Sequence, residues 1–121
     1  MHVARVVVAA VLAVIFCSSW VTAQGLRGNP RNGEGIYAQH CLRCHGKNLD
    51  GTGPEGRYLI VPPANLQSIR SRSKTDWEVL ITISHGVLFT PMHGFRERLT
   101  DEQIRDVLSY IRMMAPFDAT G

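Results

Sequence analysis

The chain has 121 residues and a formal net charge of +3, from 13 lysines and arginines against 10 aspartates and glutamates. This length suits one domain and excludes a large multidomain enzyme, while 45% hydrophobic and 19% charged residues argue against intrinsic disorder and against a polytopic membrane protein. Because only 7% of the residues are aromatic, a core built from this chain alone would be thin, and we expect a disulfide, a metal or a cofactor to support it.

The N-terminal residues 1–23 predict a secretory signal peptide. A positively charged start precedes the apolar run from Val6 to Cys17, and Val21-Thr22-Ala23 is a small-residue ending of the kind that signal peptidase accepts. An uncleaved anchor is the alternative, because the apolar stretch read on to Ala23 approaches the roughly 20 residues that span a bilayer. The remaining chain is nearly neutral in charge, so a nucleic-acid partner has no electrostatic support.

After this segment we expect a linker over residues 24–31, a domain over 32–115 and a C-terminal tail over 116–121. A first short helix is predicted from Asn32 to Cys41, although its two glycines each cost about 1 kcal/mol relative to alanine. Residues 46–65 carry Gly-Thr-Gly-Pro and Pro-Pro and predict a long irregular segment. A loop of that length needs something to wrap around.

Two further helices have stronger signals. A capping box from Thr75 to Glu78 begins a helix that runs to Ser84 or His85, with Gly86 as its stop. A second capping box from Thr100 to Gln103 begins an amphipathic helix that Pro116 ends. No segment has the pattern of a strand, so the predicted fold class is all-α.

The motif Cys41-Leu-Arg-Cys44-His45 carries the chemistry. Two thiols at this spacing, followed directly by a histidine, are typical of haem that is attached by two thioethers while the imidazole binds the iron. Three other interpretations compete: a redox-active thiol pair, which lacks its βαβ context; a zinc site, which lacks a well-spaced fourth ligand; and a plain disulfide, which leaves His45 unexplained.

With this motif, the chain resembles a class I cytochrome c of the small bacterial monohaem kind, from about Asn32 to Met114. The other matching parts are Gly33 and Tyr37, the Gly51-x-Gly53-Pro54 loop, Pro62-Pro63, residues 86–92 and the last helix. The resemblance implies a cytochrome c fold, in which short helices and long loops wrap one covalent haem c. It also implies that Gly33 and Tyr37 meet Val107 and Tyr110, and that the carbonyl of Pro62 or Pro63 accepts a hydrogen bond from His45.

Met92 is the sixth iron ligand that the resemblance implies, since it lies shortly before the last helix and beside a proline. Its order departs from the frequent Met-Pro of the family, because Pro91 precedes Met92 and His93 follows it. His93 is therefore a rival ligand, with His40 and His85 behind it. A methionine ligand holds the haem at a higher potential than a second histidine does.

The function implied is that of a periplasmic one-electron carrier, not an enzyme, between a dehydrogenase or quinol-oxidising complex and a terminal oxidase or reductase. It is either free or a bound subunit, and any membrane contact is through a partner complex or an uncleaved N-terminus. The alternatives are a gas-binding or sensing haem protein with a displaceable distal ligand, and a structural subunit of a membrane complex. A basic cluster of Arg70, Arg72 and Lys74 is interpreted as a solvated loop or a docking site for an acidic partner.

Overall fold

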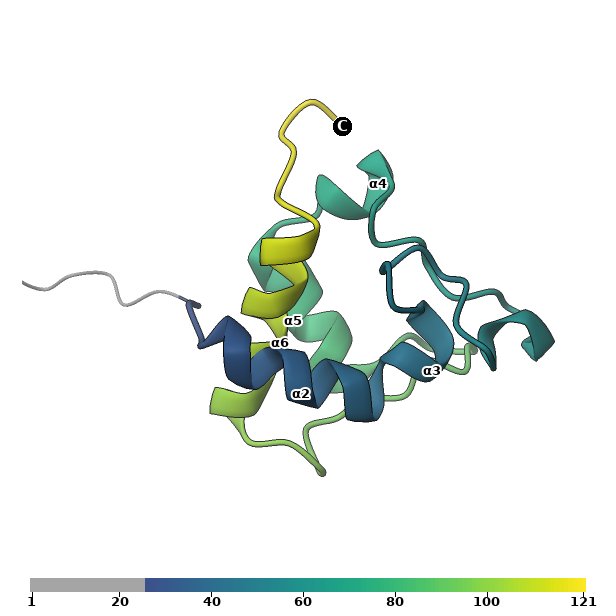
Figure 1. Ribbon diagram of the computed structural model, residues 1–121, viewed down its shortest axis with the longest axis horizontal. Helices are drawn as coiled ribbons and strands as arrows, with labels where there is room; N and C mark the ends of the chain where they lie inside the picture. The colour runs from purple at the N-terminus through teal and green to yellow at the C-terminus, as the bar shows by residue number, and fades with distance from the viewer. Residues whose placement is uncertain (1–25) are drawn as a thin grey trace, which may run out of the picture.

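A computed structural model of the chain describes residues 26–121, and its secondary structure is helical (Figure 1). The helices in chain order are α2 (Pro30–His40), α3 (Leu42–His45), the 3-10 turn η2 (Gly56–Tyr58), α4 (Ile69–Arg72), α5 (Asp76–His85) and α6 (Asp101–Met114). No strand occurs among these residues; an isolated bridge joins Gly86 to His93. The prediction of an all-α domain is confirmed.

The longest helices, α2 and α6, cross in close contact (Figure 1). Gly33 of α2 lies against the backbone of Asp106 and the Cβ of Tyr110, where an added Cβ would overlap the Asp106 carbonyl. The rings of Tyr37 and Tyr110 pack 5.3 Å apart, and Val107 is buried in the same core. The expected contacts of Gly33 and Tyr37 with Tyr110 are therefore confirmed, and the helical cost of Gly33 is explained by this close approach.

Helix α2 begins two residues earlier than predicted, so its expected start at Asn32 is wrong. The cap is Asn29, whose side chain accepts a hydrogen bond from the backbone N–H of Arg31, and Pro30 takes the first helical turn, where its missing N–H costs nothing. The backbone N–H of Asn29 donates to the buried carboxylate of Asp106 at 2.6 Å. Gly28 likewise donates to Ser109 Oγ at 2.7 Å, so residues that we expected in a linker are bound to α6.

Helices α5 and α6 begin as their sequence signals predict. In each, a threonine side chain accepts from the backbone of the third helical residue, whose own side chain accepts from the threonine N–H. Gly86, with a positive φ of 77°, ends α5, and α6 ends at Met114 before Pro116. These reciprocal bonds use backbone donors that would otherwise lack partners at a helix start.

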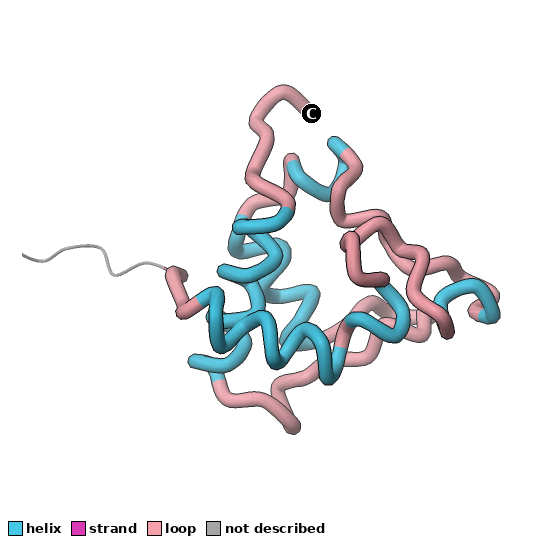
Figure 2. The backbone as a smooth tube through the Cα atoms, in the orientation of Figure 1, coloured by secondary structure: helices cyan, strands magenta, loops and turns pink. Residues whose placement is uncertain are grey.

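The loop-rich part of the chain lies to one side of the crossing helices (Figure 2). The segment over residues 46–65 is irregular as predicted, apart from the short turn η2. The four-residue helices α3 and α4 are not among the predicted elements, and Ser68 caps α4 by accepting from Ser71 N–H. Arg72 of α4 pairs with Asp118 at 3.0 Å, which joins the C-terminal tail to this helix. Arg72 is therefore the member of the basic cluster whose charge is already neutralised.

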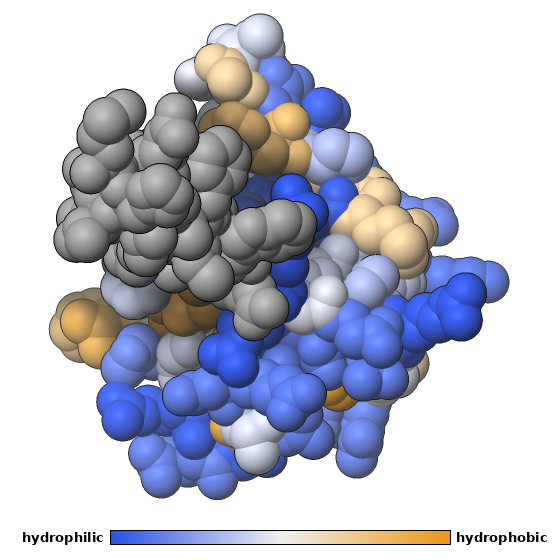
Figure 3. Space-filling model, turned by 90° about the vertical axis from the view of Figure 1, so that its left-hand side faces the viewer, coloured by the Kyte–Doolittle hydropathy of each residue, from blue (hydrophilic) through white to orange (hydrophobic). Residues whose placement is uncertain are grey.

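In Figure 3, the part of the face that is not covered by grey atoms is largely hydrophilic, with apolar side chains in separate patches. Over residues 26–121, no helix is both long and apolar enough to cross a membrane. The predicted signal peptide or anchor over residues 1–23 lies outside the described residues, as does the start of the expected linker.

Replacing Gly33 with alanine should destabilise the protein by about 1 to 3 kcal/mol, because the new methyl group forces α2 away from α6. Gly35 is the matched control: it lies on the same helix, and its added Cβ would meet nothing within 4 Å. Gly35→Ala should therefore be neutral or stabilising. Urea unfolding of the haem-loaded variants measures both, and equal stability of the two variants would contradict this account of the crossing.

Candidate functional site

The cysteine motif lies where α2 ends and the chain turns into α3. Cys41 follows the last residue of α2, and its carbonyl accepts from the backbone N–H groups of Cys44 and His45 at 3.1 and 2.9 Å. Gly46 ends α3 with a φ of 80°, and the buried hydroxyl of Tyr37 donates to its carbonyl at 2.8 Å. The helix crossing thus fixes the motif through Tyr37.

The motif opens onto an apolar cavity of about 360 Å³, a size typical of ligand sites. Both thiols line it without forming a disulfide. The walls combine side chains from α2, α5, α6 and the loops between the helices. They include Cys41, Cys44, His45, Leu59, Val61, Pro62, Pro63, Leu66, Lys74, Val79, Ile83, Val87, Pro91, Met92, His93, Phe95 and Ile111.

His45 is oriented by a backbone carbonyl. Its Nδ1 lies 3.1 Å from the oxygen of Ala64, and because a carbonyl can only accept, Nδ1 carries the proton and Nε2 keeps its lone pair for a metal. Burial lowers the pKa of His45, against a smaller opposing effect of the Ala64 hydrogen bond. The neutral imidazole, the form that binds metal, is therefore favoured.

The carbonyl that receives this bond is not the one we expected. Pro62 and Pro63 line the cavity, but neither is the partner of His45. The Pro63 carbonyl is directed at Gly51, where an added Cβ would lie 2.8 Å from its oxygen, and the next carbonyl along the chain faces the ring. No side-chain signal identifies Ala64, because every residue type offers the same backbone oxygen.

Two competing interpretations of the cysteine pair lose support. Burial, with a smaller effect of Cys44, raises the pKa of the Cys41 thiol to about 12, whereas a redox-active thiol needs a lowered pKa. Within residues 26–121, no three His, Cys, Asp or Glu side chains gather as a metal site, which removes the basis for zinc.

The loop over residues 86–93 presents Met92 to the same cavity. The bridge between Gly86 and His93 closes this loop, and Val87 N–H donates to the Met92 carbonyl at 2.8 Å. The Met92 N–H donates to Thr90 Oγ1 at 3.2 Å, and the half-buried side chain packs on the core. The backbone around Met92 is therefore held on both sides.

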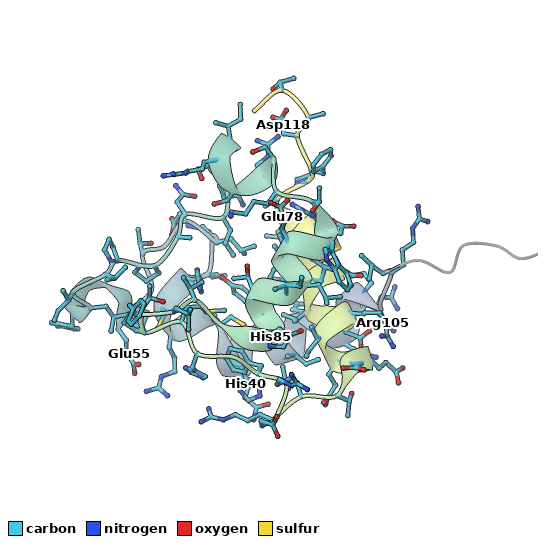
Figure 4. All side chains as sticks on the ribbon, turned by 180° about the vertical axis from the view of Figure 1, so that it is seen from behind. His40, Glu55, Glu78, His85, Arg105 and Asp118 are labelled. Atoms are coloured by element: carbon cyan, nitrogen blue, oxygen red, sulfur yellow. The ribbon has the colours of Figure 1, made fainter. Side chains whose placement is uncertain are left out.

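The rival ligands have other environments. His93 and His40 also line the cavity, but both rings pack on Phe95, and His93 Nε2 lies 3.3 Å from the Arg98 guanidinium. His85 lies at the end of α5 (Figure 4). It is exposed and does not line the cavity. Met113 and Met114 are exposed on α6, so Met92 is the one methionine of residues 26–121 that lines the cavity.

This donor set fits a haem. The cavity offers paired thiols, an imidazole with a free lone pair and a thioether, and most of its other walls are apolar. Cysteine and histidine are the residues that attach and ligate haem c, and methionine is a common sixth ligand.

Comparisons with known proteins agree with this chemistry. The protein family described as cytochrome c oxidase, cbb3-type, subunit III matches residues 28–111. One of the subunits of nicotinate dehydrogenase from Pseudomonas putida is 32% identical over 88 residues, which are 67% of this chain and 7% of that protein. The chain thus spans a small fraction of that relative.

Other similar proteins are comparable in size to this chain. A cytochrome c6-like protein of Nostoc sp. is 26% identical over 97 residues, which cover 80% of this chain and 81% of that protein. The solved structure of the KustC0563 c-type cytochrome superposes with a TM-score of 0.55 at 26% identity, over 68% of this chain and 95% of the other.

Intact mass under denaturing conditions should equal the mature polypeptide plus one haem, because thioethers survive unfolding. The double variant C41A/C44A should release its haem into acidified organic solvent. Arg43→Ala is the control between the two cysteines, since this exposed side chain pairs with Glu55 and does not line the cavity. Extraction of haem from the unaltered protein would refute covalent attachment.

Proposed function

This chain belongs to the family of c-type cytochrome domains described as cytochrome c oxidase cbb3-type subunit III, and from that premise we propose that it is a periplasmic one-electron carrier with histidine and methionine iron ligands. The family implies a covalent haem c, and the paired cysteines that it requires are present. One observation carries the finer proposal: Met92 and His45 line the same cavity as both thiols.

Each residue has a separate part in this proposal. Cys41 and Cys44 hold the cofactor covalently. His45 and Met92 would supply the two side-chain ligands of its iron, and the Ala64 carbonyl keeps the His45 ring oriented. The haem, when bound, supplies reversible one-electron oxidation and reduction. With both side chains bound to it, the iron would have no position open for a substrate.

The walls of the cavity favour electron transfer over reaction with solvent. Leu59, Val61, Ile83 and Ile111 supply apolar surface that excludes water, and they come from loops and helices on different sides. A thioether ligand and a dry surrounding both raise the reduction potential. We therefore expect a carrier that accepts electrons readily and passes them to a stronger oxidant.

The partners that we propose are a dehydrogenase or a quinol-oxidising complex as donor and a terminal oxidase or reductase as acceptor. The similarity to part of a dehydrogenase and the family description of an oxidase component support these two classes. The same similarities support a bound subunit as well as a free carrier. Separation of native periplasmic material by size, followed at the haem absorbance, distinguishes the two forms.

Replacing Met92 with alanine should open a coordination site, so that the ferrous protein binds carbon monoxide and the potential falls. Met113→Ala and Met114→Ala are the controls, because both side chains are exposed on α6. These variants should keep the optical spectrum and potential of the parent. Titration with carbon monoxide and an optical redox titration measure both properties.

Rapid and complete binding of carbon monoxide by the unaltered ferrous protein would count against the carrier. It would mean that the sixth position is open or easily displaced, and a gas-binding or sensing function would replace electron transfer.

We expect export to leave Gln24 as the mature N-terminus, because Ala23 ends the small-residue cleavage pattern. N-terminal sequencing of the periplasmic fraction should begin at Gln24. An intact Met1 in the membrane fraction would instead support an anchor.

A further inference from the structure

The charges around the cavity are unevenly distributed. Among residues 26–121, Lys74 is the one lysine or arginine that lines the cavity, although most of the wall is apolar. Lys74 is exposed, so its ammonium group can reach a carboxylate at the mouth of the cavity without being buried there. Lys74 makes no ion pair within the described part of the chain.

Two arginines near Lys74 already have acidic partners. Arg72 pairs with Asp118 at 3.0 Å and also donates to the Pro116 carbonyl. Arg112 pairs with Asp76 at 2.7 Å and donates to the backbone carbonyl of Lys74 itself. The Arg112 hydrogen bond joins the Lys74 backbone to α6, and the Lys74 side chain stays available to another group.

The Glu78 carboxylate interacts electrostatically with Lys74 and lies toward the same end of the molecule as Asp118 (Figure 4). The Glu78 carboxylate accepts from the N–H and hydroxyl of Thr75 at 2.7 and 2.8 Å, and these two bonds lower its pKa more than Lys74 does. The Glu78 carboxylate therefore interacts mainly with Thr75 in the capping box of α5.

We propose that the Lys74 ammonium binds a propionate carboxylate of the haem and so neutralises a negative charge beside the iron. This inference rests on the proposed function, because it requires a haem in the cavity. Ser71 lines the cavity three residues earlier in the chain and offers a hydroxyl to the same carboxylate. A charge-assisted hydrogen bond of this kind is stronger than a neutral one.

The direct test uses the fact that the sequence contains only two lysines, Lys47 and Lys74. The mature haem-loaded protein is labelled with ¹³C,¹⁵N-lysine and reduced to its diamagnetic ferrous state. Nuclear Overhauser contacts should join the Lys74 ε-methylene to propionate methylene protons. Lys47 is the internal control, since it is exposed and does not line the cavity.

Absence of this contact in a protein whose haem spectrum is intact would overturn the Lys74 assignment and leave electron transfer standing. Absence of covalent haem would overturn both proposals.

A second measurement compares reduction potentials. Lys74→Met should lower the ferrous-to-ferric ratio at a fixed applied potential by about threefold to tenfold, because an unneutralised carboxylate favours ferric iron. This change corresponds to a fall in the reduction potential of up to about 59 mV. Lys74→Arg should restore the parent value. Arg70→Met removes the same charge from an exposed residue outside the cavity and should change the ratio less than about twofold. Equal shifts in Lys74→Met and Arg70→Met would overturn the proposal.

Discussion

The contact between Gly33 and the Asp106 backbone is the constraint on which the rest of the structure depends. Because no side chain separates α2 from α6 at this point, the ring of Tyr37 reaches Tyr110 and its hydroxyl reaches the Gly46 carbonyl. The helix crossing therefore sets the position of the cysteine motif directly, since Tyr37 lies one helical turn before Cys41. The buried Asp106 carboxylate strengthens the same crossing by holding the Asn29 backbone at the start of α2.

The walls of the cavity away from the α2–α6 crossing are built from loops, and a few backbone hydrogen bonds hold each loop. Gly53 and Gly51 donate to the carbonyls of Cys44 and His45, which folds the irregular segment back over the motif. That packing leaves the Ala64 carbonyl facing the His45 ring. On the other wall, the bridge between Gly86 and His93 holds the Met92 loop. A small domain with few core aromatics gains much from such loops when a large apolar cofactor fills the space they enclose.

The sequence predicts local features well where one residue type determines the geometry. The capping boxes at Thr75 and Thr100 each combine a threonine hydroxyl with a glutamate or glutamine side chain three residues later, and both helices begin there. The start of α2 is harder to predict because Asn29-Pro30 is equally typical of a loop, and the contact of the Asn29 backbone with Asp106 joins residues far apart in the sequence. Helices α3 and α4 are too short for a periodic pattern. Ala64 escapes prediction because a backbone carbonyl leaves no trace in a sequence, whereas thiol, imidazole and thioether groups do.

X-ray absorption at the iron edge tests the central claim most directly, because it counts the atoms bound to iron in the unaltered protein. The claim is that the chain holds its haem between the His45 imidazole and the Met92 thioether. The expected result, in both oxidation states, is one sulfur neighbour together with the four porphyrin nitrogens and one imidazole nitrogen. A shell of light atoms without sulfur, whether complete or with a vacant position, would contradict the account.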